Sequence, residues 1–129
     1  MSGLVAVQSP ALRSRRFTRP LGETSAVGVV GGKAAALGRA MRAGLRVPDG
    51  FAVTTSAFDD YLDGSELRRQ IDSLCEPLDH REPTGLTRAS GEILSLVLES
   101  RLASHLRDEL FESAELLLKS GLVVVRSSG

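Results

Sequence analysis

The stretch VGGKAAALGRAMRAGLRVPDGFAVTT, residues 30–55, carries the clearest structural signals in the chain. A glycine pair precedes residues 34–41, a run of strong helix formers, which predicts a helix that begins at the glycines. Gly44 stands where a helix commonly ends, and Pro48 prevents its continuation. A Pro-Asp-Gly turn follows, and the short β-prone run Phe51–Thr54 then predicts a strand.

Beyond this strand the apolar spacing predicts mainly helices: a short one capped by Thr55 or Ser56, one capped by Ser65, and two within residues 86–119 that are separated near Ser100. A polar connection with two prolines covers residues 76–85. The last apolar run, Leu122–Val125, predicts a strand that is covered on both faces. Such a strand needs neighbours on either side, and the sequence offers few. We therefore expect an α+β, helix-rich chain that forms part of a larger fold.

The first 20 residues differ from the rest of the chain in composition and in hydrophobic pattern. They contain two prolines and a basic cluster without a sustained period, which indicates a flexible N-terminal extension. Within it, Leu4–Val7 is compatible with an edge strand or with a mobile tail. The predicted domain organisation is an extension over 1–20 and a folded part over 21–129.

The bulk composition excludes several classes of protein. Sixteen basic residues balance sixteen acidic ones, which argues against a nucleic-acid binder. No run approaches the roughly 20 apolar residues of a membrane span. Cys75 is the only cysteine, so no intramolecular disulfide forms, and we expect it to be reduced and buried. The composition predicts a cytoplasmic location.

The first candidate binding group is Lys33, which follows Gly31 and Gly32 at the start of the predicted helix. Glycines let a ligand approach the backbone closely, and a helix N-terminus presents N–H groups to an anion. The motif is not a P-loop, because Val27 and Ala34 occupy positions where that motif needs Gly and Ser or Thr. By itself the pattern is more typical of a glycine turn with a solvated lysine than of a binding site.

The second candidate is Arg126, directly after the predicted strand Leu122–Val125. Ligands commonly bind at the carboxyl ends of strands, and arginine binds phosphate oxygens in a bidentate manner. A structural salt bridge is the alternative. His80 and His105 have no metal-ligand spacing around them, so no metal site and no catalytic residue is predicted.

Three stretches together resemble the phosphoenolpyruvate synthase, pyruvate phosphate dikinase and rifampicin phosphotransferase family. They are VGGKAAALGRAMRAGLRVPDGFAVTT at 30–55, AFDDYL at 57–62 and VVVRSSG at 123–129. The first looks like the N-terminal signature of the family, and the last looks like its VRSS segment. The resemblance is firm at both ends and weak between Asp63 and Leu122.

The resemblance implies the N-terminal portion of an ATP-grasp nucleotide-binding domain. Carried over by position, Lys33 and Arg126 would contact the phosphates of ATP, with Gly31 and Gly32 beside them. Mg²⁺ is expected only in the full-length parent enzyme, which would pass a phosphoryl group through a histidine to pyruvate or to an antibiotic hydroxyl. The family continues VRSSA-T-x-E-D, whereas Gly129 stands in place of the alanine.

Three functions stay open at this point. The chain is a truncated fragment of an ATP-dependent phosphotransferase, inactive alone; or it is a binding module that completes a split ATP-grasp site with a separately encoded remainder. In the third interpretation it is a helical interaction domain in which residues 31–33 form only a turn.

Overall fold

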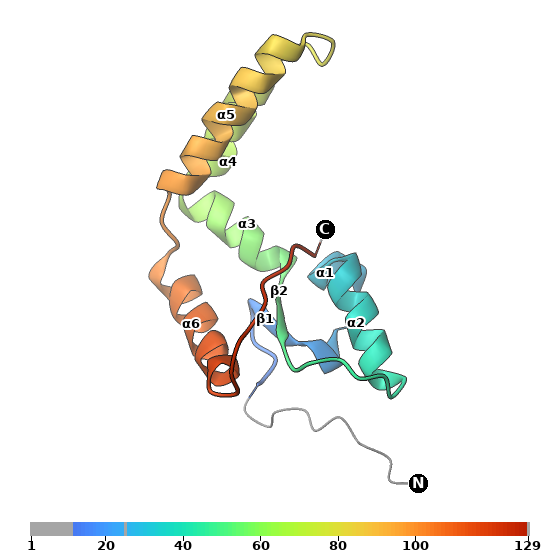
Figure 1. Cartoon of the computed structure of the whole chain (residues 1–129). Helices are drawn as coiled ribbons and strands as arrows, with labels where there is room; N and C mark the ends of the chain where they lie inside the picture. The colour runs from blue at the N-terminus through green and yellow to red at the C-terminus, as the bar shows by residue number, and fades with distance from the viewer. Residues whose placement is uncertain (1–11, 25, 129) are drawn as a thin grey trace, which may run out of the picture. The chain divides into compact units, whose positions relative to one another are not determined.

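The computed structural model describes residues 12–24 and 26–128. They divide into two units, of which the first holds the chain up to Phe58 and again from His105, and the second holds Asp59–Ser104. Helices dominate both units, and one two-stranded sheet is found among the described residues (Figure 1). The chain is therefore α+β and helix-rich, as the sequence predicted. The run Leu4–Val7 lies outside the described residues.

The sheet joins two short strands that are distant in sequence. Strand β1 (Thr18–Pro20) pairs antiparallel with β2 (Phe51–Val53), so that Thr18 lies opposite Val53. Strand β2 confirms the strand expected after the Pro-Asp-Gly turn. Strand β1 falls within the segment assigned to an extension, yet Phe17 is 3% exposed and Thr18 is 1% exposed. A three-residue strand is too short to show a period, which is why the sequence did not reveal it.

Small residues bring helix α2 (Gly32–Arg42) close to the segment before it, which holds the 3₁₀ helix η1 (Leu21–Glu23) and the short helix α1 (Val27–Val30). The buried face of α2 consists of Ala34, Ala35, Gly38 and Met41. The Thr24 hydroxyl lies 2.8 Å from the carbonyl oxygen of Ala34, which ties the end of η1 to the helix. As expected, α2 ends before Gly44, whose φ of +81° suits glycine.

Helix α6 (Ser104–Leu118) is fastened to β1 by polar contacts rather than by apolar packing alone. One oxygen of the Glu109 carboxylate accepts hydrogen bonds from the Phe17 N–H at 2.8 Å and from the Thr18 hydroxyl at 3.0 Å. The Ser113 hydroxyl donates to the oxygen of Thr18 at 3.3 Å, and Ser113 is itself buried. These hydrogen bonds hold β1 and α6 together within the first unit.

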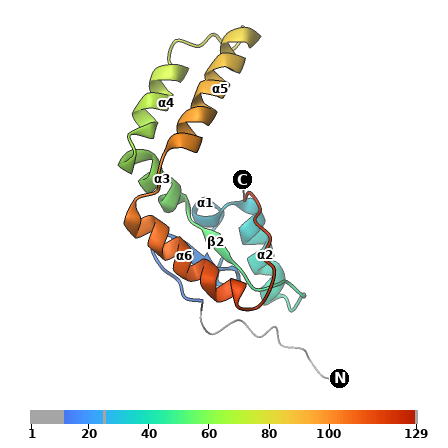
Figure 2. The ribbon, with the colours of Figure 1, turned by 60° about the vertical axis from the view of Figure 1, so that its left-hand side comes forward.

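The second unit contains two helices that lie side by side, α4 (Leu67–Cys75) and α5 (Pro83–Glu99) (Figure 2). Leu67 and Ala89 are buried in it. The Tyr61 hydroxyl donates to the carbonyl oxygen of Val97 at 3.3 Å. The hydrogen bonds that the Arg68 guanidinium donates to Asp63 and, to a lesser extent, to Asp59 raise the pKa of Arg68 above its ordinary value. The break expected near Ser100 is confirmed, because α5 ends at Glu99 and α6 begins at Ser104.

The expected caps and starts of the helices were wrong in three places. Helix α3 (Thr55–Gly64) is capped by Thr54, whose hydroxyl accepts the N–H of Ala57 at 3.3 Å. Ser65 instead donates to the carbonyl of Tyr61, and Glu66 precedes α4 with a φ of 57°. Helix α5 begins at Pro83 rather than near Leu86, because proline suits the first helical position and the Glu82 carboxylate caps the N–H of Gly85. Each difference depends on a backbone hydrogen bond that composition does not reveal.

The expectation that Cys75 is buried was also wrong, since its side chain is exposed. Cys75 is the last residue of α4.

Candidate functional site

The glycine turn before α2 has a conformation that requires glycine at its first position. Gly31 separates α1 from α2 and has a φ of +80° and a ψ of 166°. A Cβ atom at Gly31 would lie 2.5 Å from the carbonyl oxygen of Ser128, whereas one at Gly32 would meet nothing within 4 Å. Lys33 follows in the first turn of the helix, with an exposed side chain. The turn therefore precedes the first residue of α2 and is also in contact with Ser128, in another segment far along the chain.

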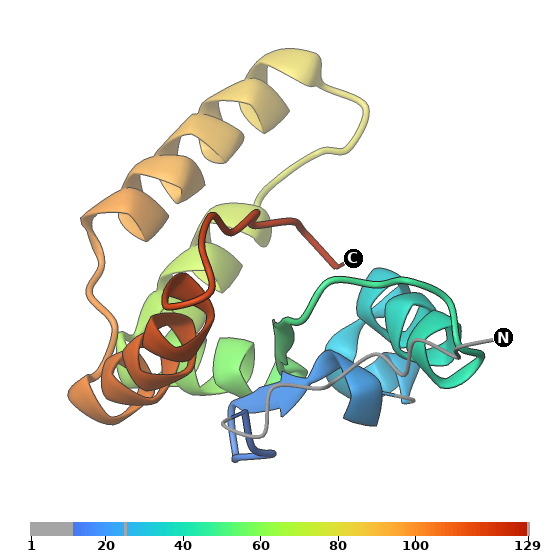
Figure 3. The ribbon, with the colours of Figure 1, turned by 60° about the horizontal axis from the view of Figure 1, so that its bottom comes forward.

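That other segment is the C-terminal run Arg126–Ser128, which reaches the start of α2 in the first unit (Figures 1 and 3). The Ser128 hydroxyl donates to the carbonyl oxygen of Val30 at 2.6 Å and accepts the N–H of Ala34 at 3.1 Å. The Ser128 carbonyl accepts the N–H of Lys33 at 3.3 Å. A serine 94 residues further along the chain thus supplies the side-chain cap that Gly31 lacks.

The two candidate cations lie on these two touching segments. The ammonium nitrogen of Lys33 donates to the hydroxyl oxygen of Ser127 at 3.3 Å. Arg126 directly precedes Ser127, and its side chain is exposed. Within the described part of the chain, the Arg126 guanidinium has no hydrogen-bond or ion-pair partner, so the alternative of a structural salt bridge finds no support there. Folding therefore brings Lys33 and the neighbourhood of Arg126 together.

Two expectations about this region were wrong. Leu122–Val125 is not a strand, and three of its side chains are almost fully exposed: Leu122 (104%), Val124 (86%) and Val125 (94%). A strand needs a hydrogen-bonded neighbour, and none of the described segments pairs with this run. The N–H groups of Lys33 and Ala34 are also not open to an anion, because Ser128 accepts both.

The histidines do not join the site. His80 is exposed in the connection before α5, and the ring of His105 lies 5.8 Å from that of Phe17, centroid to centroid. Residues 12–24 and 26–128 include no group of three or more His, Cys, Asp or Glu side chains that could hold a metal ion. The same residues include no helix that is long and apolar enough to cross a bilayer.

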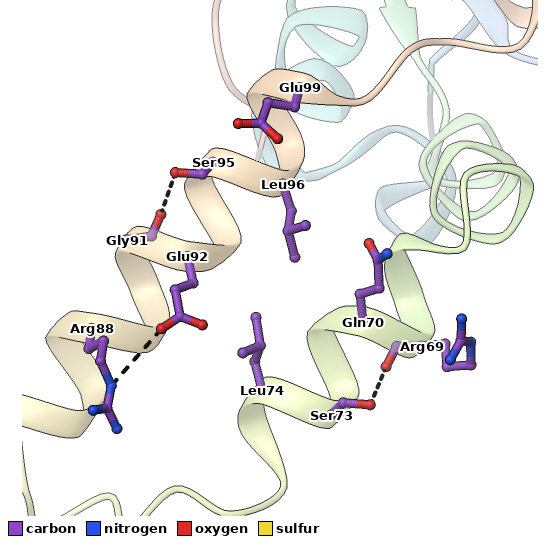
Figure 4. A pocket seen from close by; sticks show the side chains of 10 residues that line it. All are labelled: Arg69, Gln70, Ser73, Leu74, Arg88, Gly91, Glu92, Ser95, Leu96 and Glu99. Carbon is purple, nitrogen blue, oxygen red and sulfur yellow. Dashed lines mark hydrogen bonds and ion pairs between the residues drawn. The ribbon is translucent and has the colours of Figure 1, made fainter.

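The second unit has a hollow of its own, a groove of about 690 Å³ between α4 and α5 (Figure 4). Its polar side chains bond mainly within their own helices: Ser73 donates to the carbonyl of Arg69, and Ser95 donates to that of Gly91. Arg88 and Glu92 form an ion pair across one turn of α5 at 4.0 Å. None of the residues predicted from the sequence to bind a ligand lines this groove.

Comparison with known proteins connects the turn and the C-terminal run to one family. The family model described as the pyruvate phosphate dikinase AMP/ATP-binding domain matches residues 27–129, which include both segments. A phosphoenolpyruvate synthase of Helicobacter pylori is 34% identical over 126 residues, covering 91% of this chain and 15% of the relative. That of Deinococcus radiodurans is 34% identical over 116 residues, covering 85% and 15%.

An archaeal relative, a probable phosphoenolpyruvate synthase of Methanothermobacter thermautotrophicus, is 32% identical over 97 residues, covering 75% of this chain and 14% of the relative. The chain thus spans about a seventh of the length of these curated relatives. The resemblance read from the three sequence stretches is confirmed. This chain belongs to the family of pyruvate phosphate dikinase AMP/ATP-binding domains.

Proposed function

We propose that this chain provides part of an ATP-grasp nucleotide site of the phosphoenolpyruvate synthase type, in which Lys33 and Arg126 hold the phosphates of ATP. The observation that carries the proposal is the hydrogen bond from the Lys33 ammonium group to Ser127, the neighbour of Arg126. It places the Lys33 side chain against the residue next to Arg126, although the two cations are 93 positions apart (126 minus 33), in a domain whose family is described as binding AMP or ATP.

The two side chains suit complementary tasks. Lysine is a compact point charge with three donors, and arginine is a planar fork that binds phosphate oxygens in a bidentate manner. Phosphoryl transfer depends largely on positioning and on neutralising phosphate charge, which is what a pair of cations on fixed segments supplies. Gly31 and Gly32 leave the backbone beside Lys33 without side-chain bulk.

Mg²⁺ is expected in the full-length parent enzyme, and the described part of the chain has no group of three or more His, Cys, Asp or Glu side chains that could hold a metal ion. No Mg²⁺ ligand is therefore assigned here. In this proposal the chain alone holds nucleotide without turning it over, and phosphoryl transfer through a histidine to pyruvate or to an antibiotic hydroxyl would take place in a full-length parent enzyme. The cytoplasmic location stays a prediction from composition.

A second function is favoured by one specific observation, the exposed apolar run Leu122–Val125 next to the docked Ser127 and Ser128. Exposed contiguous apolar surface commonly marks a protein–protein contact. In this alternative the chain is a binding module that completes a split ATP-grasp site with a separately encoded remainder.

Isothermal titration calorimetry with ATP and Mg²⁺ tests the proposal on the full chain. Lys33→Ala and Arg126→Ala should each weaken binding about 10- to 100-fold, as expected for the loss of about 1.5–3 kcal/mol from a hydrogen bond to a charged group. Lys119→Ala and Arg46→Ala remove exposed cations of the same types elsewhere in the first unit and should leave the dissociation constant unchanged. Equal effects in all four variants would show that ATP is attracted by positive charge in general and not by Lys33 and Arg126 in particular. Absence of ATP binding by a folded chain would overturn the proposal.

A further inference from the structure

The hydroxyl and the carbonyl of Ser128 both form hydrogen bonds at the start of α2. Its hydroxyl bridges the Val30 carbonyl and the Ala34 N–H, and its own carbonyl accepts the N–H of Lys33. These partners flank Gly31 on both sides. One residue thus satisfies two of the N–H groups that the first turn of a helix otherwise leaves without partners.

The receiving surface matches this contact in shape as well as in hydrogen bonding. A Cβ atom at Gly31 would lie 2.7 Å from the Ser128 hydroxyl oxygen and 2.5 Å from its carbonyl oxygen. The backbone at Gly31 has a φ of +80°, a value that glycine adopts readily and other residues rarely do. The close approach, the backbone conformation and the hydrogen bonds are separate observations of one contact.

The contact has a direct consequence for the two cations. Without it, Arg126 only follows the run Leu122–Val125, whose apolar side chains are exposed and which has no strand partner among the described residues. With it, Ser128 is attached to the first turn of α2, which carries Lys33, and Arg126 lies only two residues before Ser128 in the chain. The hydrogen bonds of Ser128 therefore hold the backbone of the Arg126 segment beside the helical turn that carries Lys33.

We propose that Ser128 is a positioning residue, which locks the Arg126 segment onto the Gly31 turn so that Lys33 and Arg126 present one preformed site for a polyphosphate. The inference rests on the proposed function and adds to it a coupling: docking of the C-terminal run and binding of nucleotide stabilise each other. A ligand that bridges both cations binds the docked state more tightly, and by linkage a docked state binds the ligand more tightly. Ser128 itself contacts no phosphate, because its hydroxyl is engaged with Val30 and Ala34.

The opposite arrangement makes a different prediction. If Ser128 were a substitute for phosphate at the helix N-terminus, nucleotide would have to displace it, and removal of its hydroxyl would strengthen binding. The exposed placement of both cations while Ser128 is docked favours positioning over displacement.

The test compares Ser128→Ala, Ser128→Thr and the control Ser120→Ala in the full chain. Ser120 is an exposed serine after α6, and its backbone N–H donates to Leu117. Titration with ATP and Mg²⁺ should show binding about five- to ten-fold weaker in Ser128→Ala, largely restored in Ser128→Thr and unchanged in Ser120→Ala. In the absence of nucleotide, hydrogen exchange followed by NMR should show faster exchange of the Ala34 amide in Ser128→Ala only.

The outcomes separate the two proposals. Unchanged or tighter ATP binding by Ser128→Ala, with binding intact in the unmodified chain, overturns the positioning role and leaves the proposed function standing. Unchanged exchange of the Ala34 amide overturns the contact itself. Absence of ATP binding by the unmodified chain overturns the proposed function and the coupling together, whatever the exchange shows.

Discussion

The carboxylate of Glu109 accepts the backbone N–H of Phe17 at 2.8 Å, so a side chain on α6 completes the hydrogen bonding of a residue just before β1. The same oxygen accepts the Thr18 hydroxyl at 3.0 Å. Phe17 and Thr18 are both buried, so their donors have no access to water. This contact joins two parts of the first unit that are 92 residues apart in sequence.

Replacing Glu109 should therefore destabilise the chain through groups left without partners. We expect Glu109→Ala to lower the free energy of unfolding by about 1–3 kcal/mol, the usual cost of an unsatisfied buried polar group. Urea denaturation followed by circular dichroism measures the change. Glu112→Ala is the control, because within residues 12–24 and 26–128 Glu112 forms only an exposed ion pair with Arg15, so its removal should have little effect. Equal effects of the two variants would contradict the assigned role of Glu109.

Gly38 should tolerate no side chain at all. A Cβ atom there would lie 2.2 Å from the carbonyl oxygen of Thr24 and 2.6 Å from that of Leu21, and backbone atoms cannot yield as a side chain can. We expect Gly38→Ala to cost about 1–3 kcal/mol by overpacking. Gly91→Ala is the matched control in α5, because a Cβ atom there meets nothing within 4 Å. It should stabilise its helix by about 0.5–1 kcal/mol, and the two melting temperatures should shift in opposite directions.

The two glycines of the turn before α2 should respond differently to alanine. Gly31→Ala combines a strained positive φ with a Cβ atom 2.5 Å from Ser128, so we expect a loss of about 1 kcal/mol and release of the C-terminal run. Gly32→Ala has open space and a helical position, so its free energy of unfolding should not fall. Urea denaturation measures both, and hydrogen exchange at Lys33 and Ala34 reports the release. A destabilised Gly32→Ala with an intact Gly31→Ala would invert this assignment.

The second unit should depend on Leu67. Its side chain is 2% exposed, and its truncation in Leu67→Ala should cost about 2–5 kcal/mol because a cavity remains. Leu98→Ala is the control on α5, where the side chain is 75% exposed and little should change. Thermal unfolding measures both. A stable Leu67→Ala variant would show that the second unit collapses around the missing side chain.

The sequence alone determined those elements whose structure depends on residues within one short segment. Alanine, leucine and methionine after a glycine pair specify α2, and Gly44 specifies its end. The break near Ser100 and the strand at Phe51 were likewise predicted, because helix formers, turn residues and β-prone residues act within a few positions. Lys33 and Arg126 became candidates through their local patterns, a glycine pair at a helix start and the end of a predicted strand, and the family resemblance then assigned both to the phosphates of ATP.

Only the tertiary structure decided what depends on partners far along the chain. It showed that Thr18–Pro20 is a strand, because β2 and Glu109 bind it, and that Leu122–Val125 is not, because no described strand pairs with it. It also showed that Ser128 takes the N–H groups which the sequence had left open for an anion. Hydrogen bonds between segments some 90 residues apart leave no periodicity in the sequence, so their partners become known only when the chain is folded.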